Sequence, residues 1–136
     1  MADLSVTAGS VLLYDGASKG SALAGETITA GQTLYRHTDG TVKKADDTSA
    51  AKAAAVGIAL NGGAAGQPIA YLSAGGINPG GTVVVGTVYG VTDTAGGIGA
   101  ISERGTADYV TVLGIGTTAS RIEVAIQISG VAIPAP

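Results

Sequence analysis

The chain has 136 residues, a length typical of a single domain with its own hydrophobic core. Charged residues make up only 12% of it and aromatic residues only 4%, while 23 residues are glycine. With a formal net charge of −3 and no basic cluster, the chain lacks the surface that neutralises phosphates, so we expect no nucleic-acid partner. The sequence contains no cysteine, which excludes disulfide bonds and thiolate metal sites.

The stretch between Lys52 and Asp93 has no charged residue, yet it does not predict a membrane span. Glycines and prolines interrupt it, so no apolar run of about 18 residues remains. Residues 1–10 also lack the basic and apolar regions of a signal peptide. We therefore expect no membrane partner. A surface so poor in charge predicts instead that much of it contacts other protein.

The first predicted element is an N-terminal segment, residues 1–24, which carries the apolar run Val11–Tyr14. An extended arm that becomes ordered on a partner has this pattern, and so does a first strand of the domain. On the first interpretation, the residues expected to contact a partner are Leu4, Val6, Val11, Leu12, Leu13 and Tyr14.

Beyond residue 24, short runs rich in β-branched residues alternate with turn signals such as Asp39-Gly40 and Asn61-Gly62, which predicts a small barrel or sandwich. One segment, Asp46–Gly57, instead has helix start and stop signals, and we interpret it as a helical turn or an ordered loop. The predicted strands are residues 32–37, 41–45, 55–60, 68–73, 82–91, 109–115 and 121–129.

Alternation in the last predicted strand indicates which residues form the core. Every second residue there is aliphatic, so one face of the strand is expected to be buried. The predicted core residues are Ile122, Val124, Ile126 and Ile128, together with Val112 and Ile58.

One seven-residue stretch of the chain has an echo. Thr33–Asp39 reads TLYRHTD and Thr87–Asp93 reads TVYGVTD, with Thr, Tyr, Thr and Asp at matching positions. Similar strands, AVGIAL and VLGIGT, follow each copy in the same order. We interpret this as two similar β units, about residues 26–76 and 77–130, each of which covers the apolar face of the other. Coincidence among Thr-, Val- and Gly-rich strands is the alternative.

The predicted fold is therefore all-β: a compact β-barrel or sandwich built from two similar β units, with an extended N-terminal arm. Residues 25–136 form its single β domain, and residues 1–24 form the arm or a first strand.

No motif in the sequence predicts a catalytic, cofactor-binding or metal site, so we expect a protein that is not an enzyme. Gly16–Gly20 matches G-x-S-x-G, but a nucleophile elbow requires a strand–turn–helix and partners that the chain does not offer. His37 is the single histidine and lies beside an Asp-Gly turn, where a solvated side chain is expected. Asp46-Asp47 lacks the spacing of a cation site, and Gly62–Pro68 lacks the Lys-Ser/Thr of a phosphate loop.

Lys43 raises a second possibility, because lipoyl and biotinyl carriers are small barrels of two similar halves that present a lysine at a hairpin tip. Here the predicted tip is Asp39-Gly40 and Lys43 is followed by another lysine, which departs from that pattern. A small β-barrel carrier or ligand-binding module is therefore kept as an alternative.

Four stretches in order span nearly the whole chain: AGETITAGQTLYRHTDGTVKKAD, AVGIALNGGAAGQPI, GTVYGVTDTAGGI and YVTVLGIGTTASRIEVAIQISGVA. Together they resemble the small head decoration, or cement, proteins of tailed bacteriophages. The resemblance implies a β-rich protein without enzymatic activity, made in the host cytoplasm and located on the outer surface of the capsid in the virion. It also implies a homotrimer that bridges neighbouring subunits of the major capsid protein. A tail or fibre component of the virion remains a further alternative.

Overall fold

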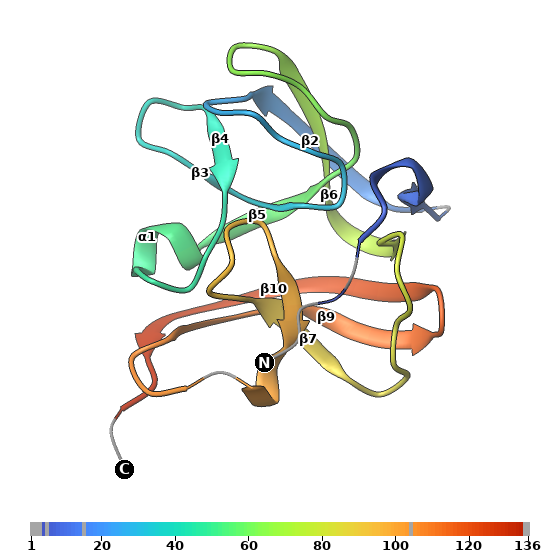
Figure 1. Cartoon of the computed structure of the whole chain (residues 1–136), viewed down its shortest axis with the longest axis vertical. Coiled ribbons are helices and arrows are strands. Elements are labelled where there is room, and N and C mark those ends of the chain that lie inside the picture. The colour runs from blue at the N-terminus through green and yellow to red at the C-terminus, as the bar shows by residue number, and fades with distance from the viewer. Residues whose placement is uncertain (1–3, 5, 15, 104, 135–136) are drawn as a thin grey trace.

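A computed structural model describes residues 4, 6–14, 16–103 and 105–134 of the chain. Within these residues, ten strands form one antiparallel sheet that curls around two clusters of buried side chains (Figure 1), which confirms the predicted all-β fold. The strands are β1 (Leu12–Leu13), β2 (Ser18–Leu23), β3 (Thr33–Arg36), β4 (Val42–Lys44), β5 (Ala55–Ala59), β6 (Pro68–Asn78), β7 (Val88–Val91), β8 (Ile98–Ala100), β9 (Tyr109–Thr118) and β10 (Arg121–Ala132).

The first unit is a small barrel built from five strands. They pair in the order β2-β6-β5-β3-β4, and a parallel bridge between Ala24 and Val42 brings the end of β2 against β4. The Gly25 N–H also donates to the Val42 carbonyl oxygen at 2.9 Å. The barrel is filled by Ala24, Ile28, Leu34, Val42, Ala59, Ile69 and Tyr71.

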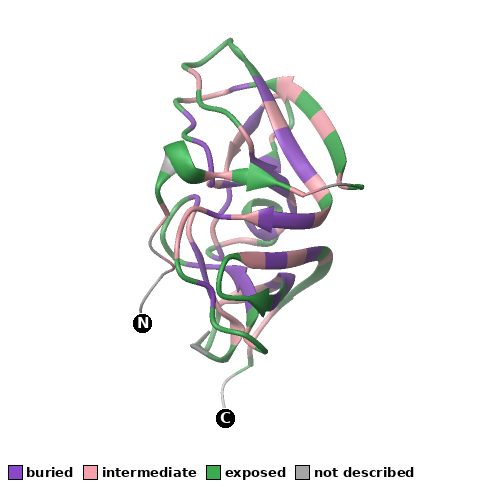
Figure 2. Ribbon diagram, turned by 90° about the vertical axis from the view of Figure 1, so that its right-hand side faces the viewer, coloured by how far each residue is buried: buried purple, intermediate pink, exposed green. Residues whose placement is uncertain are grey.

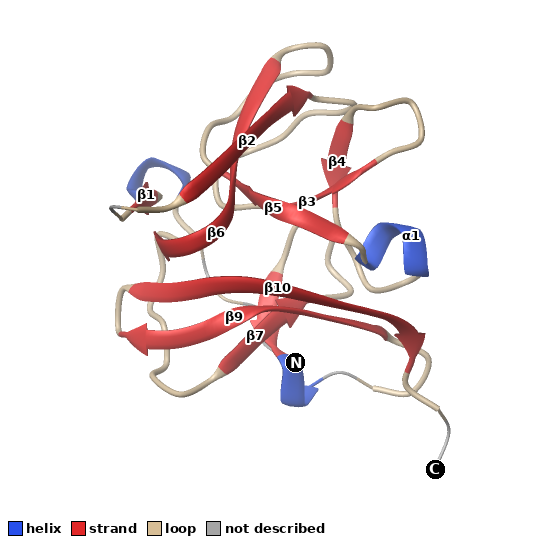
Figure 3. Ribbon diagram, turned by 180° about the vertical axis from the view of Figure 1, so that it is seen from behind, coloured by secondary structure: helices blue, strands red, loops and turns tan. Residues whose placement is uncertain are grey.

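The second unit repeats this strand order with the end of β6 in the place of β2. Its strands pair as β6-β10-β9-β7-β8, and in Figure 1 and Figure 3 it lies below the first unit. Strand β6 is thus the last strand of the first unit and the first strand of the second. The two units have the same strand order, as the repeat predicts, but their bounds differ from residues 26–76 and 77–130, because β2 belongs to the first unit and β6 to both.

Strand β6 passes from one unit to the other at a glycine pair. Ala74 is the last residue of β6 that pairs with β2 and the first that pairs with β10. Gly75 follows with φ +111°, a conformation that side-chain-bearing residues rarely adopt, and a Cβ there would lie 2.8 Å from the Ala17 Cα. A glycine is therefore required where the strand bends between the two units.

The register of the repeat differs by one residue from the one that the sequence echo indicates. Gly57 lies opposite Leu34 at a bulge in the first unit, and Gly114 lies opposite Tyr89 at a bulge in the second. The two glycines correspond as expected, but Tyr35 lies opposite Ala55, so the two tyrosines do not. Bulges shift the pairing by one residue, and the aligned sequences do not show where they fall.

The N-terminal segment lies along the sheet. Both β1 and β2 pair with β6 over most of its length, which corresponds to the first-strand alternative for residues 1–24. Leu4 donates through its N–H to the Ile98 carbonyl oxygen at 2.6 Å, and Thr7 donates to that of Gly80 at 3.0 Å. Where it is described, this segment is not a free arm.

The core prediction is correct for Ile122, Val124 and Ile58, which are all buried. It is wrong for Ile128, which is 50% exposed, and Ile126 is only partly buried. The pairing of β10 with β6 ends at Ala125, so no second neighbouring strand covers the rest of β10. A register shift after Val124 also changes the alternation.

Val112 is half-buried, and its neighbour Leu113 occupies the core instead. The predicted strand 82–91 begins only at Val88, because residues 82–87 form a loop with Gly86 at φ +84°. The open question at residues 46–57 is resolved as the short helix α1 (Ala50–Ala53), whose N-cap Ser49 accepts a hydrogen bond from the Lys52 N–H at 3.2 Å. Among the described residues, no helix has the length and apolar character needed to cross a membrane.

We predict that two isoleucines of β10 differ sharply in their contribution to stability. Ile122→Ala removes a fully buried side chain and is expected to lower the free energy of unfolding by about 2–5 kcal/mol. Ile128→Ala is the matched control at an exposed site, and the change should be within about 0.5 kcal/mol. Urea unfolding followed by circular dichroism measures both. Equal losses would contradict the burial described here.

Candidate functional site

One row of side chains crosses the outer face of the first unit. Thr33, Ile58 and Leu72 lie directly opposite one another on β3, β5 and β6, and each is 0% exposed. Ile58 and Leu72 belong to the cluster that also contains Tyr89 and Ile98 of the second unit. The outer face of the first unit is therefore buried against the second.

The corresponding row of the second unit is not covered. Val88, Ile115 and Glu123 lie directly opposite one another on β7, β9 and β10, in the same pairing positions. Val88 is 38% exposed, Ile115 is 43% exposed and the Glu123 side chain is 44% exposed. The same face of the repeat is therefore buried in the first unit and exposed to solvent in the second.

The loop before β7 carries two further exposed valines, Val84 and Val85, but it lies on the core side of β9. The Val84 carbonyl oxygen faces Gly116, and the Val84 N–H donates to the hydroxyl oxygen of the buried Tyr89 at 2.9 Å. Figure 2 views the molecule from the side on which this loop runs. We therefore limit the name outer face to Val88, Ile115 and Glu123 of the second unit.

The charge on the outer face is compensated within the chain. The Arg121 guanidinium lies 2.8 Å from a Glu123 carboxylate oxygen and stacks over the Tyr14 ring, with its central carbon 4.6 Å from the ring centroid. It also crosses Gly76 so closely that a Cβ there would lie 2.5 Å from its Nε. The arginine is held by three neighbours, and the face as a whole is apolar with one ion pair at its border.

The structure divides the six residues predicted to contact a partner. Leu4 and Val11 pack against the protein's own core, and Val6 contacts Gly31. Leu12 and Leu13 are exposed, and Tyr14 lies under Arg121. Of the six, Leu12 and Leu13 are exposed, whereas Leu4, Val6, Val11 and Tyr14 are partly buried. The sequence did place a β-branched run at residues 82–85, but its interpretation as a strand hid the exposure of Val84 and Val85.

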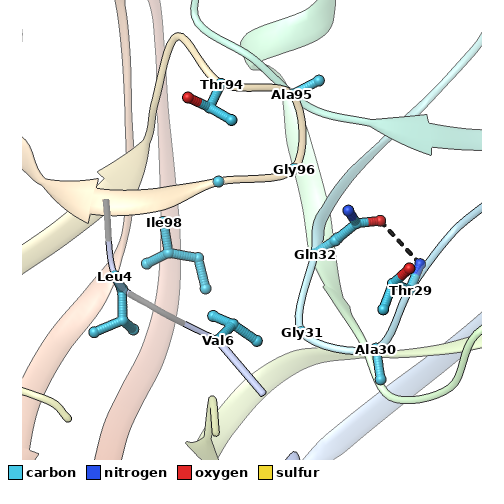
Figure 4. A pocket seen from close by; sticks show the side chains of 11 residues that line it. Leu4, Val6, Thr29, Ala30, Gly31, Gln32, Thr94, Ala95, Gly96 and Ile98 are labelled. Atoms are coloured by element: carbon cyan, nitrogen blue, oxygen red, sulfur yellow. Dashed lines mark hydrogen bonds between the residues drawn. The ribbon is translucent and has the colours of Figure 1, made fainter. Parts of the chain in front are cut away.

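A cavity of about 360 Å³ lies where the two units meet the N-terminal segment (Figure 4). The lining side chains carry no charge, and the backbone N–H groups of Gly31, Gln32, Gly96 and Gly97 all donate within the protein. The Gln32 Oε1 accepts from the Thr29 N–H at 2.9 Å. Such a cavity suits an apolar group, because it offers no charge and few polar partners to a ligand.

The tip of the β3–β4 hairpin carries the single histidine. The His37 Nδ1 lies 3.3 Å from an Asp39 carboxylate oxygen, and both side chains are substantially exposed. The Thr41 hydroxyl and N–H donate to that carboxylate at 2.6 and 2.9 Å, and these bonds lower the pKa of Asp39 to about 2. This is a solvated turn, as the sequence indicates.

The remaining motifs do not assemble into a site. Lys43 lies within β4 opposite Tyr35, not at the hairpin tip, so the lysine position of a carrier is not reproduced. Ser18 begins β2, so the G-x-S-x-G stretch leads into a strand where an elbow requires a helix. Among the described residues, no group of three or more His, Cys, Asp or Glu side chains is placed to hold a metal ion.

No protein-family model matches this chain, and no curated protein matches its sequence.

We predict that Thr41 controls the titration of Asp39. A carboxyl whose pKa is lowered stabilises the folded turn above its ordinary pKa of 3.8, and that stabilisation is lost as the pH falls toward 2. Thr41→Val removes the hydroxyl donor and should move the Asp39 midpoint upward. NMR titration of the side-chain carboxyl carbon measures it, with Thr38→Val as the control in the same turn. An unchanged midpoint in Thr41→Val would contradict this cause.

Proposed function

We propose that this chain is a structural virion protein that binds the outer surface of an assembled phage capsid. It stabilises the capsid by bridging neighbouring subunits of the major capsid protein, and it acts as a homotrimer without enzymatic activity. The class of protein is inferred from the resemblance of four ordered stretches of the sequence to phage decoration proteins. The outer face is the surface that we expect to contact the capsid.

The observation that carries the proposal is the difference between the two rows. In the first unit, the row of Thr33, Ile58 and Leu72 is sealed by protein. In the second unit, the corresponding row is open to solvent, with Val88 and Ile115 side by side on it. Neighbouring exposed apolar side chains on a protein this poor in charge are typical of a protein interface.

The energetics of this surface suit a protein that binds many equivalent sites at once. Fully burying a Val or Ile side chain contributes about 1.5–3 kcal/mol, and the side chains of the outer face are already partly covered. One protomer therefore gains modest affinity from the outer face. An oligomer that engages several capsid subunits multiplies that affinity through effective concentration.

We predict that Ile115→Lys weakens decoration of purified capsids at least about tenfold, because it places a charge at the centre of the row. Leu23→Lys is the matched control, since Leu23 is an exposed aliphatic residue at the end of β2, in the other unit. Co-sedimentation with capsids measures binding, and circular dichroism checks that both variants fold. Equal retention of the two variants on capsids would show that the outer face is not the docking surface.

A second prediction concerns salt. Since the outer face carries few charges to screen, raising the ionic strength from about 0.1 M to about 1 M should change capsid retention by less than about threefold. Release of the protein over that range would show that ion pairs dominate the contact. Electron microscopy of labelled particles distinguishes a capsid location from the tail or fibre alternative.

A further inference from the structure

The second unit contains a strand-shaped slot that its own consecutive strands do not fill. In the first unit, Gly25 lies two residues after the end of β2, and its N–H donates to the carbonyl oxygen of Val42, the first residue of β4. In the second unit, the corresponding acceptor is the carbonyl oxygen of Ile98, the first residue of β8. Its donor is the N–H of Leu4, which lies far away in the sequence.

Leu4, Val6 and Thr7, which we call the closing segment, occupy this slot between β8 and the end of β6. The Leu4 N–H donates to Ile98 on one side at 2.6 Å, and the Thr7 N–H donates to Gly80 on the other at 3.0 Å. Figure 4 shows the Leu4, Val6 and Ile98 side chains close together at one end of the cavity. The closing segment therefore completes the second unit as the end of β2 completes the first.

Glycines shape the slot for this segment. A Cβ on Gly31 would meet the Val6 side chain, and a Cβ on Gly80 would lie 3.0 Å from the Thr7 nitrogen. Both glycines also have positive φ, at +91° and +83°. The slot thus receives the backbone of the closing segment at close range, with Leu4 and Val6 lining the cavity beside it.

Among the described residues, the closing segment is held by the backbone bonds of Leu4 and Thr7 and by the packing of Leu4 and Val6, and a short tether joins it to β1. Beyond Thr7, only the 3-10 turn η1 (Ala8–Ser10) and Val11 connect it to β1. Leu12 and Leu13 of β1 remain exposed on the outside of this connection. Release from the slot would lose the two backbone bonds and the partial burial of Leu4, Val6 and Val11, and an identical slot on a second copy restores them all.

We propose that, in the oligomer, this slot is filled by the closing segment of a second copy of the chain. Exchange of an identical segment is a low-cost route to association, because the contacts in the slot are the same within one chain or between two. The exposed Leu12 and Leu13 of the tether favour exchange, because the neighbouring copy would cover them. The proposal rests on the oligomer proposed above.

The absence of natural cysteines allows a direct test by disulfide trapping on the full chain. Chains carrying only Leu4→Cys are co-expressed with tagged chains carrying only Ile98→Cys, then oxidised and separated without reductant. Exchange predicts a disulfide-linked heterodimer between the two kinds of chain. Leu4→Cys with Leu23→Cys is the control pair. A heterodimer no more abundant than in that control overturns the exchange.

A second measurement needs no cysteine. Gly80→Ala places a Cβ against Thr7 at a residue with φ +83°, whereas Gly66→Ala creates the same strain at φ +87° with no atom within 4 Å. Exchange predicts that Gly80→Ala lowers the oligomer to a monomer in sedimentation velocity while Gly66→Ala does not. Oligomers of equal size in both variants overturn it. Capsid retention of the Ile115→Lys variant reports separately on the proposed function, because that change lies on the outer face and outside the slot.

Discussion

The whole molecule depends on the shared use of strand β6. Its first part pairs with β2 and β5, and its last part pairs with β10 and β1. The transition requires Gly75 at a positive φ with the backbone of Ala17 close beside it. Because one strand serves both units, their relative placement is fixed by backbone hydrogen bonds as well as by side-chain packing. The row of Thr33, Ile58 and Leu72 on the first unit is therefore buried against the second unit, whereas the outer face of the second unit stays exposed to solvent.

Much of this fold follows from local patterns in the sequence. Alternating and β-branched runs located seven strands, and the echo of TLYRHTD in TVYGVTD located the repeat. Strand β2 was missed because SKGSAL lacks both signals and is a strand only through its pairing with β6. Burial at Ile128 was mistaken because alternation gives the face of a strand, not what covers it. The open row was likewise beyond local reasoning, since it depends on which unit lies against which.

The two units show how one repeated fold can bury a row of side chains in one copy and expose the corresponding row in the other. In the two rows, Thr33 occupies the position equivalent to Val88, Ile58 the position equivalent to Ile115, and Leu72 the position equivalent to Glu123. In the first copy an aliphatic residue ends the row inside the protein, and in the second an acidic residue ends it beside Arg121. The second row keeps two aliphatic residues at the surface, and the ion pair between Glu123 and Arg121 lies at its border. In the proposed function, this exposed row of the second unit is the surface that contacts the capsid.

The bond between Leu4 and Ile98 has a consequence for the order in which the protein can be made. Chains leave the ribosome from the N-terminus, so the closing segment emerges long before the strand that receives it. The first barrel has all five of its strands once β6 has been synthesised, whereas the second waits for β10, the last strand of the chain. During that interval Val6 and Val11 can reach Gly31 of the first barrel, but the Leu4 N–H has no Ile98 carbonyl oxygen to meet until β8 has been made. The N-terminus of the chain is therefore among the last parts to reach its final hydrogen bonds.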